Sequence, residues 1–155
     1  MITKKSDPTC TTMSYTNKTQ PTAINPDAYL QKNMANKPAV QAEAKVLIDL
    51  YAQATGWPAV MWNKIFGFGK YFYQDSKGGE HEYLASGFTI SATGFTLYNL
   101  LGWKAYEKEI ANLGKHKFSG KSCLNIKSIT DIDLAVLAKV IKLSVVDLKK
   151  KYRVE

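Results

Sequence analysis

The stretch from Trp57 to Phe118 constrains the fold most, because it holds most of the aromatic residues and most of the glycines of the chain. Aromatic residues interrupted by short glycine-containing segments are typical of β-strands joined by turns. Strands are expected near residues 66–73, 84–90 and 95–100. The breaks between them are too short for parallel crossovers, so the pattern predicts an antiparallel meander.

Side-chain alternation gives the first of these strands two different faces. Phe66, Phe68 and Phe72 share one parity, and Tyr71 and Tyr73 share the other. Because successive side chains of a strand point to opposite faces, we expect the phenylalanines in the core and the phenols toward water or a cleft. Lys70 falls on the phenylalanine parity, which indicates either a local bulge or an edge strand.

Two helices are expected before the meander. Asn25 followed by Pro26 is typical of a helix start, since asparagine caps the first amides and proline fits the first helical position. A longer helix is expected from Pro38, with apolar residues at helical spacing. Gly56 is expected to end it, because glycine readily adopts the left-handed conformation of a helix stop.

Two further helices and a short strand are expected after the meander. Apolar residues at helical spacing predict a third helix from Trp103 to about Leu113. A short strand follows at residues 123–126. Thr130 and Asp133 are spaced as a capping box, which predicts that the last helix begins there.

Residues 1–24 are rich in threonine and lack periodic apolar positions. They offer too little apolar surface to fix a structure, so we expect a disordered tail at 1–24 and a single domain at 25–155. No apolar run approaches the length of a membrane span, and no apolar region follows the first lysines. These features favour a cytoplasmic protein without membrane contact.

The net charge of +8 favours anionic partners. The surplus lies in the first 40 residues and after residue 118, whereas the aromatic segment between them is nearly neutral. Stacking of single-stranded nucleic acid on Tyr71 and Tyr73 would need positive charge beside those rings. A nucleic-acid partner is therefore disfavoured.

No catalytic constellation is visible, so we expect a protein that is not an enzyme. Cys10 and Cys123 form neither a disulfide framework nor a metal clip, and Cys123 is expected as a small buried side chain. Catalysis by Cys123 with His116 is disfavoured because no acid or second histidine lies nearby to orient His116. The segment Gly67–Lys70 lacks the spacing of a nucleotide loop, and its glycines are interpreted as permitting close packing or a bulge.

Asp75, Glu80, His81 and Glu82 are the one cluster of potential metal ligands in the sequence. Carboxylates with one imidazole could hold iron or manganese. In a strand, however, residues 80 and 82 share one face and residue 81 takes the other, so the ligands converge only at a turn. Solvated polarity of a hairpin is the preferred interpretation, and iron is kept as an alternative.

The most distinctive stretch is residues 114–123, which contain Lys115, His116, Lys117, Lys121 and Ser122. Three lysines with hydroxyls and glycines could form a cationic loop whose amides also face an anion. The alternative is a solvated turn whose cations complement the end of the preceding helix. Both interpretations stay open.

Several motifs in this order resemble the bacterial YdhG-like family, a domain of unknown function. They are Met61-Trp62, Ile65-Phe66-Gly67-Phe68-Gly69 with Tyr71 and Tyr73, Gly87-Phe88, Thr96-Leu97-Tyr98, Leu113-Gly114-Lys115-His116-Lys117, Gly120-Lys121-Ser122-Cys123-Leu124 and Asp131-Ile132-Asp133-Leu134. The resemblance runs from about Pro26 to Lys150.

The resemblance implies a small α+β domain of the secretion-chaperone-like kind, with a curved antiparallel sheet packed by helices. It adds a strand near 117–122, so the expected order is helix, helix, three-strand meander, helix, one or two strands, helix. Some family members are labelled frataxin-like intracellular iron chaperones, which implies iron as the alternative cofactor. The net positive charge of this chain is the wrong sign for gathering iron.

The leading hypothesis is an uncharacterised small binding domain. Trp62, Tyr71 and Tyr73 would frame a cleft together with the loop at residues 115–122, and the cleft would bind an anionic small molecule or an acidic peptide. The alternatives are an iron chaperone and a module that binds a protein partner through an exposed sheet or helix face.

Overall fold

Two helices open the part of the chain that the computed structural model describes, residues 19–155. Helix α1 (Pro26–Asn33) is capped by Asn25, whose Oδ1 accepts from the Asp27 N–H at 2.8 Å. Helix α2 (Pro38–Thr55) ends at Gly56, which adopts a left-handed conformation with φ 81°. Both predicted helices, with their start and stop signals, are confirmed.

The strands of residues 19–155 form one antiparallel sheet in the order β1-β2-β3-β4-β6-β5, and β7 pairs with β2. Their bounds are β1 (Ala59–Trp62), β2 (Ile65–Gln74), β3 (Glu80–Ser91), β4 (Gly94–Tyr98), β5 (Lys117–Ser119), β6 (Cys123–Ile126) and β7 (Arg153–Val154). The predicted meander corresponds to β2, β3 and β4. The sequence patterns did not predict β1 or β7.

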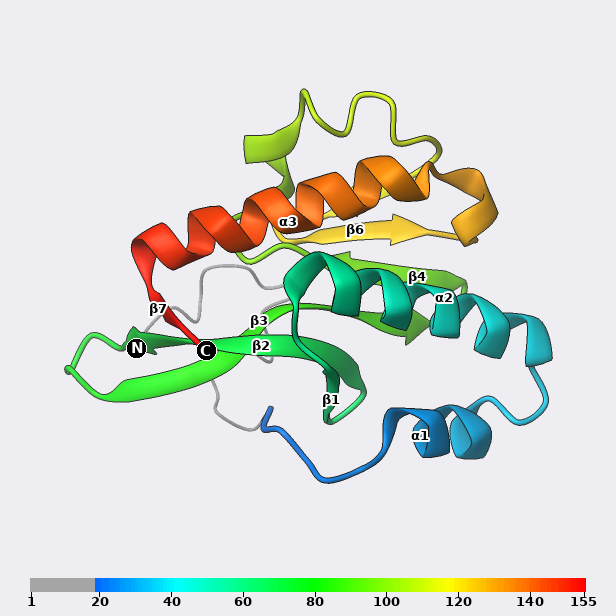
Figure 1. Ribbon diagram of the computed structural model, residues 1–155, viewed down its shortest axis with the longest axis horizontal. Helices are drawn as coiled ribbons and strands as arrows, with labels where there is room; N and C mark the ends of the chain where they lie inside the picture. The colour runs from blue at the N-terminus through cyan, green and yellow to red at the C-terminus, as the bar shows by residue number, and fades with distance from the viewer. Residues whose placement is uncertain (1–18) are drawn as a thin grey trace.

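Helices α2 and α3 (Leu134–Lys151) lie side by side on one face of the sheet (Figure 1). The core fills the space between this helix layer and the strands, and it includes Leu47, Phe66, Phe88 and Ile141. Phe66 and Phe88 stack across β2 and β3 with ring centroids 4.8 Å apart. The predicted α+β fold with a curved, unclosed antiparallel sheet packed by helices is confirmed.

The prediction of a third α-helix is wrong. Only a 3₁₀ segment, η3 (Trp103–Tyr106), forms, and turns continue to Asn112. The Leu113 N–H donates to Ile110 O, at 3.0 Å, three residues back, whereas the Ile110 N–H donates to Tyr106 O, at 3.0 Å, four residues back, so no continuous α-helical pattern forms. Apolar residues three or four positions apart suit both tight turns and an α-helix, so their spacing could not separate the two.

The start of the last helix also differs from its prediction. Asp133 alone caps α3, where its Oδ1 accepts from the Ala135 and Val136 amides at 2.9 and 3.2 Å. Thr130 lies instead in a second 3₁₀ segment, η4 (Ile129–Asp131), which Ser128 caps. The predicted capping box is therefore replaced by two successive single caps.

The glycines of β2 permit close packing, as interpreted from the sequence. A Cβ on Gly67 would overlap the Trp62 indole, and one on Gly69 would overlap that of Trp57. Gly69 has φ 69°, yet the pairing of β2 with β3 keeps the same register before and after it. The local distortion therefore leaves the alternation intact, and Lys70 is placed beside Glu82 with Nζ and Oε1 3.2 Å apart. Phe66 and Phe68 lie in the core as expected, but Phe72 is only half-buried because its end of β2 extends beyond the helix-covered core.

The outer edge of β1 is covered by residues assigned above to the tail. Pro21 forms an antiparallel bridge with Trp62, and the Thr22 N–H donates to Met61 O at 2.8 Å. Thr19 is buried. Residues 19–24 are thus part of the described structure, and the remainder of the expected tail, 1–18, lies outside the described residues.

Candidate functional site

The lysine-rich segment forms a hairpin at one end of the sheet, which we call the β5 hairpin (residues 115–122). It contains β5 and the turn that leads to β6, and β5 pairs with β6 from Lys117 to Ser119. The Trp103 indole N–H donates to Ser122 O at 3.0 Å, and the Trp103 backbone N–H donates to Lys121 O at 3.0 Å. Because Trp103 is buried, these bonds tie the turn to the core.

His116 and Phe118 form a ring pair on this hairpin. Nδ1 of His116 lies 2.6 Å from Gly114 O. A carbonyl can only accept, so Nδ1 carries the proton and donates. The two rings meet edge to face with centroids 5.1 Å apart, and Phe118 is 52% exposed. Phe118 was not among the predicted site residues, although an aromatic residue within a basic stretch was a signal for it.

The lysines of the β5 hairpin are not neutralised within residues 19–155. Lys115, Lys117 and Lys121 are exposed, and none of them makes an ion pair with a described carboxylate. Their positive charge is therefore available to an anionic partner.

Trp62, Tyr71 and Tyr73 belong to a second apolar cluster, separate from the helix-covered core. Trp62 is buried and meets Tyr83 edge to face with centroids 6.0 Å apart. Tyr71 and Tyr73 are half-buried, and burial raises the pKa of each phenol above its ordinary value. The three predicted aromatic residues therefore act first as packing, not as an open stacking surface.

The predicted cleft is not formed by the described residues. Trp62 lies on β1 and Tyr71 on β2, whereas the β5 hairpin lies at the opposite end of the strand order. Three strands separate β2 from β5, which corresponds to roughly 19 Å at the usual strand spacing. The structure brings the aromatic residues together and the lysines together, but it does not bring the two groups around one concavity.

The four potential metal ligands are engaged in other contacts. Asp75 Oδ2 and His81 Nε2 are 2.7 Å apart, and Asp75 Oδ1 also accepts from the Gly79 N–H at 2.8 Å. The hydrogen bond from His81, followed by those from the turn amides, lowers the pKa of Asp75 to about 2. Glu82 pairs with Lys70 and Glu80 with Arg153. Residues 19–155 contain no group of three such side chains that could hold a metal ion.

Cys123 is buried, as expected, but it is disulfide-bonded in the structure. The expectation that the cysteines form no disulfide is therefore wrong for Cys123, and a thiolate nucleophile is not present there. The other cysteine of the chain, Cys10, lies outside the described residues.

A search of protein-family models, curated proteins and solved structures finds no match to this chain. None of the helices formed by residues 19–155 has the length and apolar character needed to cross a membrane. The site must accordingly be interpreted from its own chemistry.

Proposed function

We propose that this protein is a non-enzymatic binding domain that takes an acidic segment of a partner protein along the β5 hairpin. The observation that carries the proposal concerns three lysines of the β5 hairpin, none of which pairs with a carboxylate of residues 19–155. They lie close in sequence to a half-exposed phenylalanine, Phe118, on the last strand in the sheet order. Lysines attract carboxylates, and an exposed aromatic ring supplies an apolar anchor.

The two ends of the sheet differ in a way that favours this edge. At the β1 end, Pro21 and Thr22 already bond to the outer strand. At the other end, no described strand lies beyond β5, and the Gly114–Ile132 bridge and the Lys115 N–H bond to Asp131 O, at 3.1 Å, end before β5 begins. Terminal strands accept extended peptides by adding a strand to the sheet, with the side chains along the edge selecting the sequence. Lys115, Lys117 and Lys121 would select for acidic residues.

We also propose that the chain is related to the YdhG-like family, whose motifs it resembles, and that it is located in the cytoplasm. A disulfide at Cys123 is instead typical of an oxidising compartment. Alkylation of the protein in freshly lysed cells, without reductant, decides between these locations. A freely alkylated Cys123 supports the cytoplasm, and a protected one overturns that location. Iron is not carried forward as an alternative, because the candidate carboxylates already pair with His81, Lys70 and Arg153.

The test is binding of a fluorescein-labelled nonapeptide of alternating glutamate and valine, measured by fluorescence anisotropy at two salt concentrations. The triple variant Lys115→Ala/Lys117→Ala/Lys121→Ala should weaken binding by about tenfold and reduce its salt dependence, since each exposed charge pair contributes a fraction of a kcal/mol. Circular dichroism checks that the variant is folded.

The matched control removes three exposed lysines from the helix layer, in the variant Lys45→Ala/Lys139→Ala/Lys142→Ala. It carries the same change of net charge and should leave the affinity within about twofold, because general attraction is weak beyond the Debye length. Equal losses in both triple variants, or no loss in either, would contradict a specific site at the β5 hairpin.

A further inference from the structure

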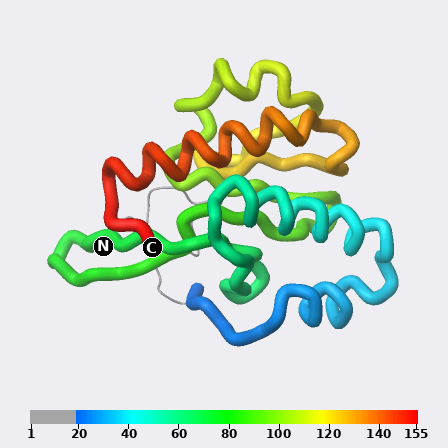
Figure 2. The backbone as a smooth tube through the Cα atoms, viewed as in Figure 1, coloured from blue at the N-terminus to red at the C-terminus, as the bar shows by residue number. Residues whose placement is uncertain are grey.

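The last residues of the sequence form an added strand on the edge of β2. The edge of β2 is shared: β1 covers it from Ile65 to Phe68, and β7 covers it at Tyr71 and Phe72. Backbone bonds join Lys70 and Glu155 in both directions, at 2.9 and 2.8 Å. Figure 2 shows this end of the chain, in red, meeting the green strand after the turn that follows α3.

Side chains of β2 and β3 recognise one residue of this strand, Arg153. Its guanidinium carbon lies 4.0 Å from the centre of the Phe72 ring, which is a cation–π arrangement. Its Nη2 lies 3.6 Å from Glu80 Oε2. Beside it, Tyr152 packs on Tyr71 with ring centroids 5.0 Å apart. The edge of β2 thus contacts both an arginine and the aromatic residue that precedes it.

Few contacts keep β7 on the edge of β2. Its pairing with β2 spans two residue pairs, and the Arg153 side chain is 57% exposed. Exposed ion pairs contribute little to stability, so the contacts of Arg153 can be exchanged for equivalent contacts from another chain. An extended segment with the same side chains would compete with β7 for the same edge.

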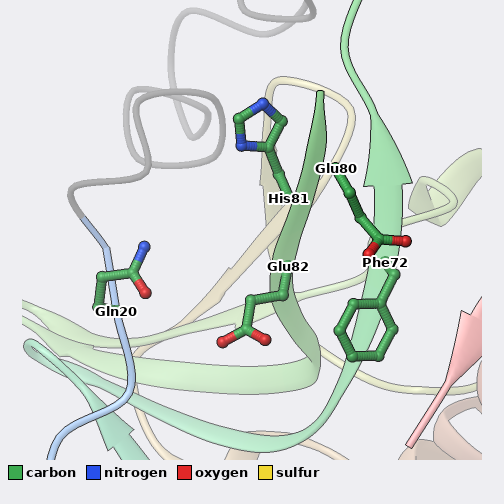
Figure 3. A pocket seen from close by; sticks show the side chains of 5 residues that line it. All are labelled: Gln20, Phe72, Glu80, His81 and Glu82. Carbon is green, nitrogen blue, oxygen red and sulfur yellow. The ribbon is translucent and has the colours of Figure 1, made fainter. Parts of the chain in front are cut away.

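An open pocket of about 410 Å³ adjoins the Arg153 contacts. Phe72, Glu80 and Glu82 line it together with His81, and Gln20 lies on the opposite side from Phe72 (Figure 3). Phe72 and Glu80 are the same side chains that hold Arg153. A segment that extends from the Arg153 position into this pocket could therefore place a further polar or cationic side chain beside two carboxylates.

We propose that the edge of β2 from Lys70 to Gln74 is a docking site for an extended arginine-containing segment of another protein, and that β7 occupies this site until such a segment displaces it. The partner has the chemistry of β7 itself, namely an aromatic residue, an arginine, a β-branched residue and an acid. This site lies on a different edge from the β5 hairpin and does not depend on it.

The test uses the full chain and a fluorescein-labelled peptide, Lys-Tyr-Arg-Val-Glu, in fluorescence anisotropy. Arg153→Ala removes the guanidinium contacts of the internal occupant, so this variant should bind the peptide about tenfold more tightly than the unchanged chain. Glu155→Pro should act in the same direction, because it removes the N–H that donates to Lys70 O. The two variants disturb β7 by different routes.

A second set of variants changes the residues that contact the peptide instead of β7. In the Arg153→Ala chain, Glu80→Gln should weaken peptide binding severalfold, whereas Glu107→Gln, an exposed control outside β2 and β3, should not. A peptide with alanine in place of arginine should bind poorly. Failure of both folded β7 variants to bind the peptide would overturn the proposal. The proposal would also be overturned if the unchanged chain formed a dimer and both β7 variants were monomers. In that case the segment on the edge of β2 would come from a second copy of this chain.

Discussion

Tyr51 of α2 stacks on Phe68 of β2 with ring centroids 5.1 Å apart and an angle of 23° between the planes. The Tyr51 side chain is fully buried, and its hydroxyl has no hydrogen-bond partner among the described residues. Burial raises the pKa of this phenol far above its ordinary value. The ring thus contributes packing, while the hydroxyl has lost its bonds to water without replacement.

The variant Tyr51→Phe should therefore be more stable than the unchanged protein, by about 1 kcal/mol in the free energy of unfolding, because an unsatisfied buried hydroxyl is removed. Urea denaturation at pH 7 measures the difference. The matched variant is Tyr106→Phe, whose hydroxyl donates to Asp147 Oδ2 at 2.7 Å. It should be less stable by a similar amount. Equal effects of the two substitutions would contradict this assignment.

Gly67→Ala should lower the free energy of unfolding by about 1–3 kcal/mol, because the added methyl overlaps the Trp62 indole and forces repacking. Urea denaturation followed by tryptophan fluorescence measures both the loss and the displacement of the ring. Gly78→Ala is the contrast, since no heavy atom lies within 4 Å of the added methyl although φ is 84°. It should cost about 1 kcal/mol of backbone strain without altering the native emission spectrum.

The helices were predictable because their signals are local. Asn25 caps α1 and Gly56 ends α2 through contacts within one turn of the chain. Strands β1 and β7 have no comparable signal. The two residues of β7 form a strand only because the edge of β2 beyond Phe68 is left open by β1. This open edge is a property of the tertiary structure, so the identity of the two residues could not predict the strand.

The candidate site was predictable in part for the same reason. Lys115, Lys117 and Lys121 lie close in sequence and stay together on one hairpin. Joining them to Trp62 required the strand order, in which β6 lies beside β4 and carries the hairpin to the far end. The burial of Trp62 had a signal in Gly67. The short β1–β2 hairpin brings the Trp62 indole over Gly67, where only a residue without a side chain leaves room for it.

Acid should remove the stabilisation that the Asp75 contacts supply. The pKa of Asp75 falls from the usual 3.8 to about 2 on folding, mainly because of the hydrogen bond from His81. A carboxyl group with a lowered pKa stabilises the folded state above its unfolded value and loses that contribution as the pH falls through its folded value. Asp75→Asn should thus be less stable than the unchanged protein at pH 5, and the gap should narrow between about pH 4 and pH 2. Urea denaturation across this range measures the gap, and a gap that widens as the pH falls would refute the assignment.

Glu43 of α2 should couple energetically to Ser128, 85 residues away in sequence. Its carboxylate accepts from Ser128 Oγ at 3.0 Å and from the Ile129 N–H at 2.9 Å, at the start of η4. Glu43→Ala leaves both donors without this acceptor, and we expect a loss of about 1–2 kcal/mol in the free energy of unfolding. Ser128→Ala keeps the Ile129 bond but also removes the Oγ that caps η4 by accepting from the Thr130 N–H at 3.2 Å, so we expect a loss of similar size.

A double-mutant cycle separates the pair from its surroundings. In the Glu43→Ala background, Ser128→Ala should cost less than it does alone, since its partner is already gone, with a coupling of about 0.5 kcal/mol or more. Glu43→Gln provides a further check, because a neutral amide oxygen accepts a weaker bond than a carboxylate and should give an intermediate stability. Strict additivity of the two alanine substitutions in urea denaturation would mean that α2 and η4 are held together by apolar packing and not by this hydrogen-bonded contact.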